Sequence, residues 1–151
     1  MRKTTAVVCS AFAFAMGFAV ANWQPAARAA DDVISAQIIH VPSLVYNDLS
    51  APPPVGDMRS KTLVSVDGMT IAVQEGNVAR HTHPNTHEIQ YIVSGEGKLS
   101  LGDSERDVRA GDLIIIPKGV IHGGTKPVSG RFRAIAIKTP PQKPGDTVFV
   151  Q

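Results

Sequence analysis

From residue 61 onward the chain is a series of short apolar or alternating runs separated by glycine and proline, and this punctuation constrains its fold more than any other feature. The 13 glycines and 11 prolines leave little room for a longer pattern. Apolar residues rarely recur at the period of about 3.6 residues that marks an amphipathic helix. Short runs bounded by turn formers are typical of β-sandwiches and β-barrels. We therefore predict an all-β domain without a long helix.

The same pattern places the individual strands. A hairpin is expected from residues 62–66 and 69–75, which flank the turn-forming pair Asp67-Gly68. The run 113–116 is entirely apolar and is expected to be buried on both faces. Further strands are expected over residues 88–93, 98–101, 106–109 and 132–137, with turns at 94–97 and 102–103.

The first 29 residues have the features of a secretory signal peptide. Arg2 and Lys3 supply the positive start, and residues 4–21 form an uncharged apolar stretch. Ala27-Arg28-Ala29 is the expected cleavage site, with Ala19-Val20-Ala21 as an earlier alternative. We expect cleavage, no stable membrane insertion afterwards, and a periplasmic or secreted protein. An uncleaved membrane anchor is the alternative.

Loss of this segment would change both the charge and the cysteine content. The segment carries three basic residues and no acidic one, so the formal net charge would fall from +2 to −1. No nucleic-acid partner is therefore expected. The single cysteine, Cys9, would also be removed, which excludes disulfides and thiol catalysis in the processed chain. About 120 residues would remain, enough for one domain.

The rest of the chain divides into three parts. Residues 30–60 contain a strand expected within 32–41 and a Pro-rich arm, which either lies across the domain or is mobile. Residues 61–139 are expected to form the barrel. Residues 140–151 form a tail with a short terminal strand expected at 147–150.

Four of the five histidines lie in two short blocks, residues 81–88 and 111–122, which together can close a mononuclear metal site. His81 and His83 are separated by one residue, so an extended strand places both imidazoles on one face. Glu88 and His122 can complete the coordination shell from neighbouring strands. Imidazole and carboxylate without sulfur suit a first-row divalent ion.

His87, within the first block, and His40, outside both blocks, are weaker candidates for metal ligands. His87 adjoins Glu88, and on a strand two adjacent side chains point to opposite faces, so only one of them can reach the metal. His40 lies far from both blocks and is expected to be an ordinary residue of a strand or the arm.

The two blocks resemble the two motifs of the cupin family. Gly76, His81, His83, Glu88 and Gly95 are similar to the first motif, and Gly111, Pro117, Gly119 and His122 are similar to the second. The resemblance covers residues 62–137 and implies a single-domain jelly-roll barrel, or double-stranded β-helix, with a metal near its centre. It implies His81, His83, Glu88 and His122 as the ligands, and it favours Glu88 over His87 through the spacing to Gly95.

Two positions depart from the family pattern. Four residues rather than five separate Gly76 from His81, which puts the local turn in question. Lys126 occupies a position where the second motif often has asparagine, and we expect it to make the mouth of the pocket more basic.

Two residues are expected to support the metal or to contact a substrate. Gln90 is two residues from Glu88 on the same strand and therefore shares its face. Its alternative is a polar residue hydrogen-bonded within the barrel. Arg131 and Arg133 share one face of the last strand, where they would bind a substrate carboxylate if that face points inward, or solvent if it points outward. Tyr91 is expected to point away from the metal.

No independent nucleophile or acid–base pair stands out, so any catalysis should be centred on the metal. The ion is left open among Mn²⁺, Fe²⁺, Co²⁺, Ni²⁺, Cu²⁺ and Zn²⁺. The resemblance implies a metal-dependent enzyme acting on a small organic molecule, either a dioxygenase-like oxidoreductase or a metal-assisted isomerase or lyase. The alternatives are a non-catalytic module that binds a small molecule or a metal, and a structural export with an incidental site. The resemblance also implies a homodimer, with the arm and the tail as material for strand exchange.

Overall fold

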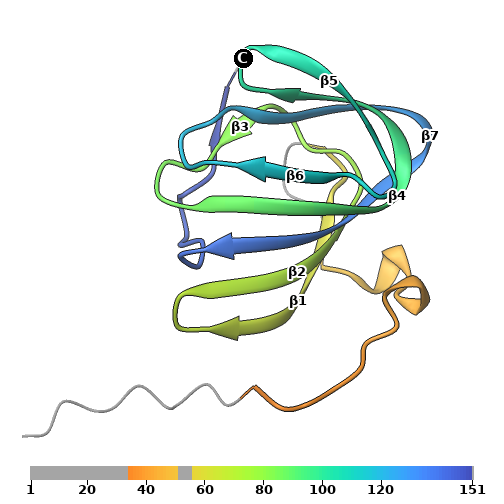
Figure 1. Cartoon of the computed structure of the whole chain (residues 1–151), viewed down its shortest axis with the longest axis vertical. Coiled ribbons are helices and arrows are strands. Elements are labelled where there is room, and N and C mark those ends of the chain that lie inside the picture. The colour runs from red at the N-terminus through yellow and green to blue at the C-terminus, as the bar shows by residue number, and fades with distance from the viewer. Residues whose placement is uncertain (1–33, 51–55, 151) are drawn as a thin grey trace, which may run out of the picture. The chain divides into compact units, whose positions relative to one another are not determined.

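The computed structural model describes residues 34–50 and 56–150 (Figure 1). The expected signal peptide, residues 1–29, lies outside the described residues. In the part of the chain that is described, no helix has the length and apolar character needed to cross a membrane.

Antiparallel strands account for most of the described chain. The strands are β1 (Arg59–Val66), β2 (Met69–Glu75), β3 (His81–Thr82), β4 (His87–Leu101), β5 (Ser104–Arg109), β6 (Leu113–Ile116), β7 (His122–Thr139) and β8 (Val148–Phe149). Two 3₁₀ turns precede them, η1 (Val41–Ser43) and η2 (Tyr46–Asp48). The expected hairpin is confirmed, because β1 pairs with β2 across Asp67-Gly68.

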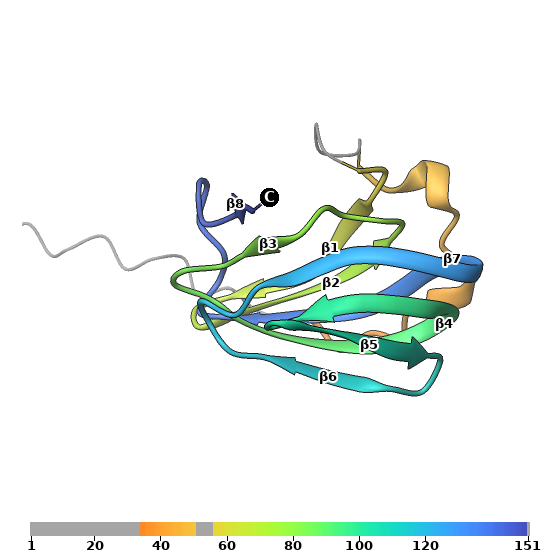
Figure 2. The ribbon, with the colours of Figure 1, turned by 90° about the horizontal axis from the view of Figure 1, so that it is seen from above.

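Two long strands, β4 and β7, run through both layers of the barrel (Figures 1 and 2). Residues 87–92 of β4 pair with residues 134–139 of β7, and residues 96–101 pair with residues 122–129. The first layer therefore has the order β1-β2-β7-β4-β6, and the second has the order β8-β3-β7-β4-β5. This arrangement confirms the predicted double-stranded β-helix.

The turn expected at residues 94–97 is wrong, because β4 continues through it. The register against β7 shifts repeatedly between Ile92 and Ser100, as in a bulged strand. A Cβ atom at Gly95 would lie 2.6 Å from the carbonyl oxygen of Arg131, and one at Gly97 would lie 2.2 Å from that of Lys126. These glycines let β4 bend against β7 as it passes from one layer to the other.

The core lies between the two layers and is built from inward-facing residues. Its fully buried members are Ile92, Leu99, Val108, Ile114, Ile116, Phe132 and Ala134. The expectation that β6 is buried on both faces is wrong, because Leu113 and Ile115 are 62% and 65% exposed. Among the described strands β6 pairs only with β4, so it is an edge strand with one face on the core and one outside.

The arm lies against the barrel, and it is not a strand where it is described. Residues 34–40 have no regular structure, and Pro42 opens η1, consistent with its fixed φ and missing N–H. Arg133 donates hydrogen bonds to the carbonyl oxygens of Val41 (3.3 Å) and Leu44 (2.8 Å). The guanidinium groups of Arg59 and Arg131 lie 5.0 and 4.2 Å from the centre of the Tyr46 ring. For residues 41–46, the structure therefore shows the alternative in which the arm lies across the domain.

Candidate metal centre

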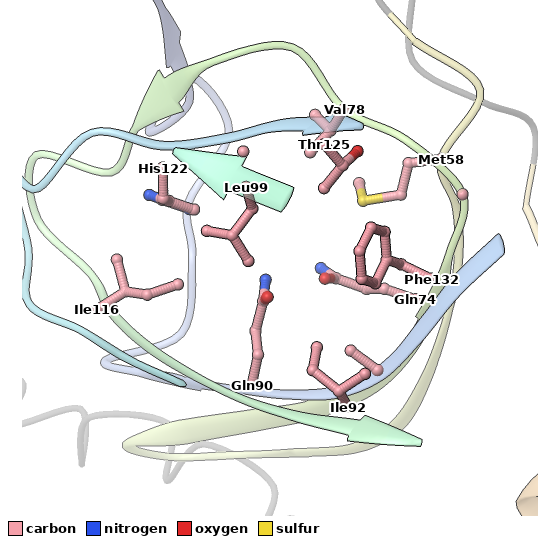
Figure 3. A pocket seen from close by; sticks show the side chains of 13 residues that line it. Met58, Gln74, Val78, Gln90, Ile92, Leu99, Ile116, His122, Thr125 and Phe132 are labelled. Atoms are coloured by element: carbon pink, nitrogen blue, oxygen red, sulfur yellow. The ribbon is translucent and has the colours of Figure 1, made fainter. Parts of the chain in front are cut away.

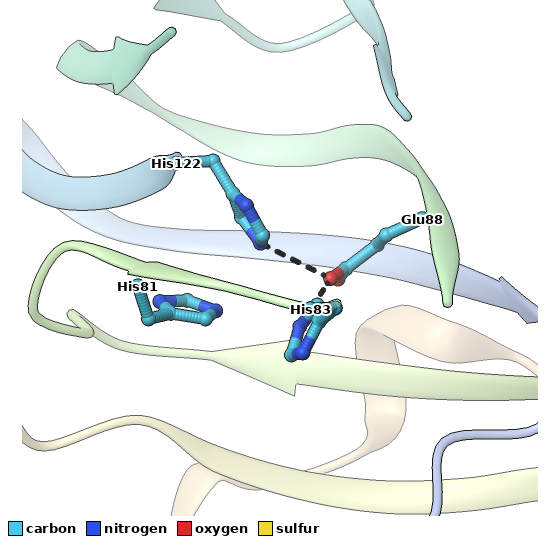
Figure 4. A group of neighbouring side chains, drawn as sticks. All are labelled: His81, His83, Glu88 and His122. Carbon is cyan, nitrogen blue, oxygen red and sulfur yellow. Dashed lines mark ion pairs between the residues drawn. The ribbon is translucent and has the colours of Figure 1, made fainter. Parts of the chain in front are cut away.

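The structure brings the four predicted ligand residues together (Figure 4). His81 begins β3, His83 directly follows it, Glu88 is the second residue of β4, and His122 begins β7 opposite His81. Each side chain is buried, and each offers one donor atom that lies within 4.8 Å of the others. Donors from both layers therefore meet inside one end of the barrel. We call these four residues the His/Glu cluster.

The backbone fixes how each imidazole of the cluster presents its nitrogens. The Nδ1 atoms of His81, His83 and His122 lie 2.8, 2.9 and 3.0 Å from the carbonyl oxygens of Ala79, Asp146 and Val120. Since a carbonyl oxygen can only accept, each Nδ1 carries the hydrogen and each Nε2 of the neutral ring carries a lone pair. Backbone acceptors of this kind commonly orient histidines that bind metals.

Glu88 presents one carboxylate oxygen to these lone pairs. Gln90 Nε2 donates to Glu88 Oε1 at 2.8 Å, which leaves Oε2 facing the cluster. Oε2 lies 3.1 Å from His83 Nε2 and 3.3 Å from His122 Nε2. Glu88 Oε2 and His122 Nε2 are buried and have no hydrogen-bond partner among the described residues. Lone pairs this close need a shared cation, either a proton or a metal ion, and three imidazoles with one carboxylate fit a divalent transition metal.

Burial and neighbouring groups keep His81 and Glu88 in the forms that bind metal. Burial, reinforced by the nearby His122, lowers the pKa of His81 to about 4, so its ring is neutral at pH 7. Burial alone would raise the pKa of Glu88. In the metal-free protein, hydrogen bonds that His122 and His83 donate when Nε2 is protonated, the charge of Lys138 and the hydrogen bond from Gln90 outweigh it and hold that pKa well below its usual value. The carboxylate is therefore ionised.

Gly123 makes room for the cluster. Its φ is +92°, and a Cβ atom there would lie 2.7 Å from the carbonyl oxygen of Ala79 and 3.1 Å from Nδ1 of His81. These are the two atoms that fix the ring of His81. A glycine directly after His122 is thus required by the close approach of β3 to β7.

His81, His83 and Glu88 of the cluster line a cavity of about 270 Å³, and His122 lines an adjoining inner chamber of about 40 Å³. Met58, Gln74, Val78 and Gln90 line both spaces. Figure 3 shows Gln90, Ile92 and Leu99 of β4 and Phe132 of β7 projecting into the inner chamber. The arrangement offers a small organic molecule a polar end at the cluster and an apolar end within the barrel.

Several single-residue expectations can now be compared with the structure. Gln90 lies on the face of Glu88, as predicted. The condition set for a substrate role of Arg133, an inward-pointing face, is not met: Arg133 does not line the cavity, faces the arm and forms an ion pair with Glu75. Tyr91 is half-exposed, as expected.

The remaining histidines and Lys126 lie away from the cluster. His87 is exposed, and its Nδ1 accepts a hydrogen bond from the Lys118 amide at 3.2 Å. His40 is an exposed arm residue. The expected effect of Lys126 on the pocket is wrong, because Lys126 pairs with Glu105 of β5 and does not line the cavity.

Two residues at the cluster were missed from the sequence. Lys138, near the end of β7, places Nζ 3.7 Å from Glu88 Oε2. Asp146 supplies the carbonyl for His83, and its Oδ1 accepts from the amide and the side chain of Asn85 at 3.0 and 2.8 Å. A usable signal for Lys138 is the alternation on β7, where Ala134 and Ala136 mark the narrow inward face. No comparable signal identifies Asp146.

Comparison with known proteins agrees with this fold. The sequence profile of the family described as "Cupin domain" matches residues 68–138. A search of curated proteins found no match. An uncharacterized protein with a double-stranded β-helix domain from Klebsiella pneumoniae is similar, with a TM-score of 0.56, 18% identity, and coverage of 72% of this chain and 96% of that one.

Two further solved structures are similar at the level of the fold. KdgF from a Halomonas species has a TM-score of 0.53 and 18% identity, covering 62% of this chain and 87% of that chain. A variant of Streptomyces Pac13, solved with uridine, has a TM-score of 0.54 and 18% identity, covering 71% of this chain and 88% of that chain. Pac13 is described as a nucleoside dehydratase. Together with the double-layered barrel and the His/Glu cluster, the profile match shows that the barrel of this chain is a cupin domain.

Proposed function

We propose that this protein is a metal-dependent enzyme that binds one divalent transition metal through His81, His83, Glu88 and His122 and acts on a small organic molecule. One observation carries the proposal: buried Nε2 and carboxylate atoms converge at the wall of a cavity, and among the described residues Glu88 Oε2 and His122 Nε2 have no hydrogen-bond partner. A bound metal would supply Lewis-acid polarisation of a ligand oxygen, or dioxygen chemistry if it is redox-active. We propose Mn, Fe, Co, Ni, Cu or Zn as candidates, since each accepts this donor set.

The surrounding residues have definable roles in such an enzyme. Gln90 holds Glu88 Oε1 and so directs Oε2 toward the cluster. The apolar walls of the inner chamber exclude water and orient the organic part of a ligand. Either a dioxygenase-like oxidation or a metal-assisted isomerase or lyase reaction suits this arrangement. That Pac13 is described as a dehydratase supports the second class for a barrel of this kind.

We further propose that the protein is exported after loss of residues 1–29. The basic start, the apolar stretch and the small-residue site at Ala27-Arg28-Ala29 support this. N-terminal sequencing of the protein from periplasmic and culture-medium fractions is the test. A chain that begins at Ala30 supports export, and an intact N-terminus in the cytoplasmic fraction contradicts it.

A homodimer is also proposed, and the structure adds a face that we expect to take part. Within one chain the tail pairs with β3 and the arm binds Arg133, and an exchanged dimer would make the same contacts between two copies. In addition, Tyr91, Leu113 and Ile115 form an uncharged, exposed strip on β4 and β6. An uncharged patch can pair with its own copy without repulsion. Sedimentation of wild-type protein and of Leu113→Lys is the test, and a wild-type monomer at high concentration would contradict the proposal.

Metal content and turnover test the main proposal. Protein purified from its own export compartment should contain one metal ion per chain by elemental analysis. His81→Ala and His122→Ala should lose that stoichiometry, whereas His87→Ala should keep it because His87 lies outside the cluster. Full metal content in both cluster variants would sink the assignment.

Oxygen-uptake assays on phenols, enols and small keto acids then separate the reaction classes. Substrate-dependent oxygen loss indicates an oxygenase. Substrate conversion without oxygen loss indicates an isomerase or lyase. A stoichiometric metal with binding but no conversion indicates the alternative, a non-catalytic binding module.

A further inference from the structure

A lysine faces the His/Glu cluster from the inner side of β7, and the proposed function does not use it. The Lys138 side chain is only 13% exposed, and its Nζ lies 3.4 Å from His83 Nε2 and 3.7 Å from Glu88 Oε2. It follows Ala134 and Ala136 on the inward face. The ammonium group is therefore a fixed part of the cavity wall beside the donor atoms.

The charges around this group do not balance once a metal is bound. Among the described residues that line the cavity, Lys138 is the only lysine or arginine, and Glu88 is the only carboxylate. A divalent ion and an ammonium group would then share one carboxylate in the cavity lining, an excess of two positive charges, which the buried carboxylate of Asp146 behind His83 reduces to one. Such an excess is unfavourable unless an anion compensates it.

The protein partners of Lys138 satisfy hydrogen bonds without supplying charge. Nζ donates to the Gln142 side-chain oxygen, and the Gln142 amide in turn donates to the Thr147 hydroxyl. Both partners come from the tail and both are neutral. The missing negative charge must therefore come from a ligand in the cavity.

We infer that Lys138 makes this site selective for small organic anions, carboxylates or enolates, with one oxygen on the metal and the same or a neighbouring oxygen accepting a hydrogen bond from Lys138 Nζ. The organic remainder would enter the inner chamber beside Ile92, Leu99 and Phe132. The inference rests on the proposed function, because it takes the metal at the His/Glu cluster as given.

Anion affinity measured on the cobalt-loaded protein tests this inference. Pyruvate and its neutral amide, pyruvamide, are titrated calorimetrically into wild type, Lys138→Met, Lys138→Arg and a control, Lys126→Met. Lys126 is a lysine of the same strand that pairs with Glu105 outside the cavity. We expect Lys138→Met to weaken pyruvate about tenfold or more, as for a charge-assisted hydrogen bond, without weakening pyruvamide. Lys138→Arg should retain part of the affinity, and Lys126→Met should match wild type.

Cobalt stoichiometry, measured on the same samples, separates the two proposals. Failure of wild type to bind cobalt refutes the metal site itself. If wild type and Lys138→Met both bind one cobalt, equal pyruvate affinity in the two proteins overturns the inference and leaves the metal site intact. Loss of cobalt only in Lys138→Met would also overturn it, because Lys138 would then support the metal rather than an anion.

Discussion

The metal-free protein should lose stability on mild acidification because His81 is buried in its neutral form. The ring is 6% exposed, and its pKa falls from 6.5 to about 4 on burial. Between these values the unfolded chain takes up a proton at His81 that the folded chain does not, so the free energy of unfolding falls as the pH falls. At about 1.4 kcal/mol per pKa unit, the loss is about 2 kcal/mol by pH 5 and approaches about 3 kcal/mol at lower pH.

Urea unfolding in the presence of a chelator at pH 7, 6 and 5 measures this loss. The comparison is between wild type, His81→Gln and the exposed control His87→Gln, and it concerns the pH dependence rather than the absolute stability. Wild type and His87→Gln should lose about 2 kcal/mol more than His81→Gln between pH 7 and pH 5. Glu88 contributes below this interval, because its lowered pKa stabilises the fold above its ordinary value of 4.5 and the benefit disappears only at lower pH. The same pH dependence in His81→Gln and wild type would refute the reasoning.

Three further substitutions test the supports of the cluster and of the arm. Gly123→Ala should weaken metal binding about tenfold or more by displacing His81. The control is Gly130→Ala, because Gly130 also has a positive φ but a Cβ atom there would have no atom within 4 Å. Equal metal affinities of the two variants in a competition titration would contradict this prediction. Gln90→Leu should weaken metal binding about tenfold by freeing Glu88, and Gln74→Leu, on the same cavity wall, serves as the control in the same titration. Arg133→Met should lower the free energy of unfolding by about 3 kcal/mol, because Glu75 is only 12% exposed and would lose its partner. Urea unfolding checks this against Lys98→Met, whose exposed ion pair should matter little; a similar small change in both would contradict it.

An all-β fold and a possible metal site were accessible from the sequence because both depend on local spacing, whereas the double-layered barrel and the full ligand set were implied by the resemblance to the cupin motifs. One residue between His81 and His83 is enough to place two rings on one face of an extended segment. Asp67-Gly68 between two β-rich runs is enough to predict the hairpin. Glycine was less informative, since it marks turns and bulges alike. The expected turn at Gly95 and Gly97 is a bend within β4, where backbone approach to β7, invisible in the sequence, decides the outcome.

The inner and outer faces of β7 were harder to assign from the sequence, because the charged residues and the small residues of this strand suggest different inward faces. Arg131 and Arg133 suggest that their face points inward to a ligand, whereas Ala134 and Ala136 indicate that the opposite face does. Ala134 and Ala136 are buried on the inward face, and the bulkier Ile135 and Ile137 alternate with them on the other face. With that phase fixed, Lys138 must point to the cluster and the two arginines to the arm.

The tail shows why the site could not be completed from its motifs. His83 obtains its Nδ1 acceptor from Asp146, 63 positions away, and β8 pairs with β3 directly beside the first histidine. A backbone carbonyl can be supplied by any residue type, so the sequence carries no trace of this contact. The position of Asp146 is instead set by its side chain, which accepts two hydrogen bonds from Asn85 within the first histidine block. The motif residues supply the metal-binding atoms. The orientation of the His83 ring, however, is fixed by the Asp146 carbonyl in the distant tail, which no motif marks.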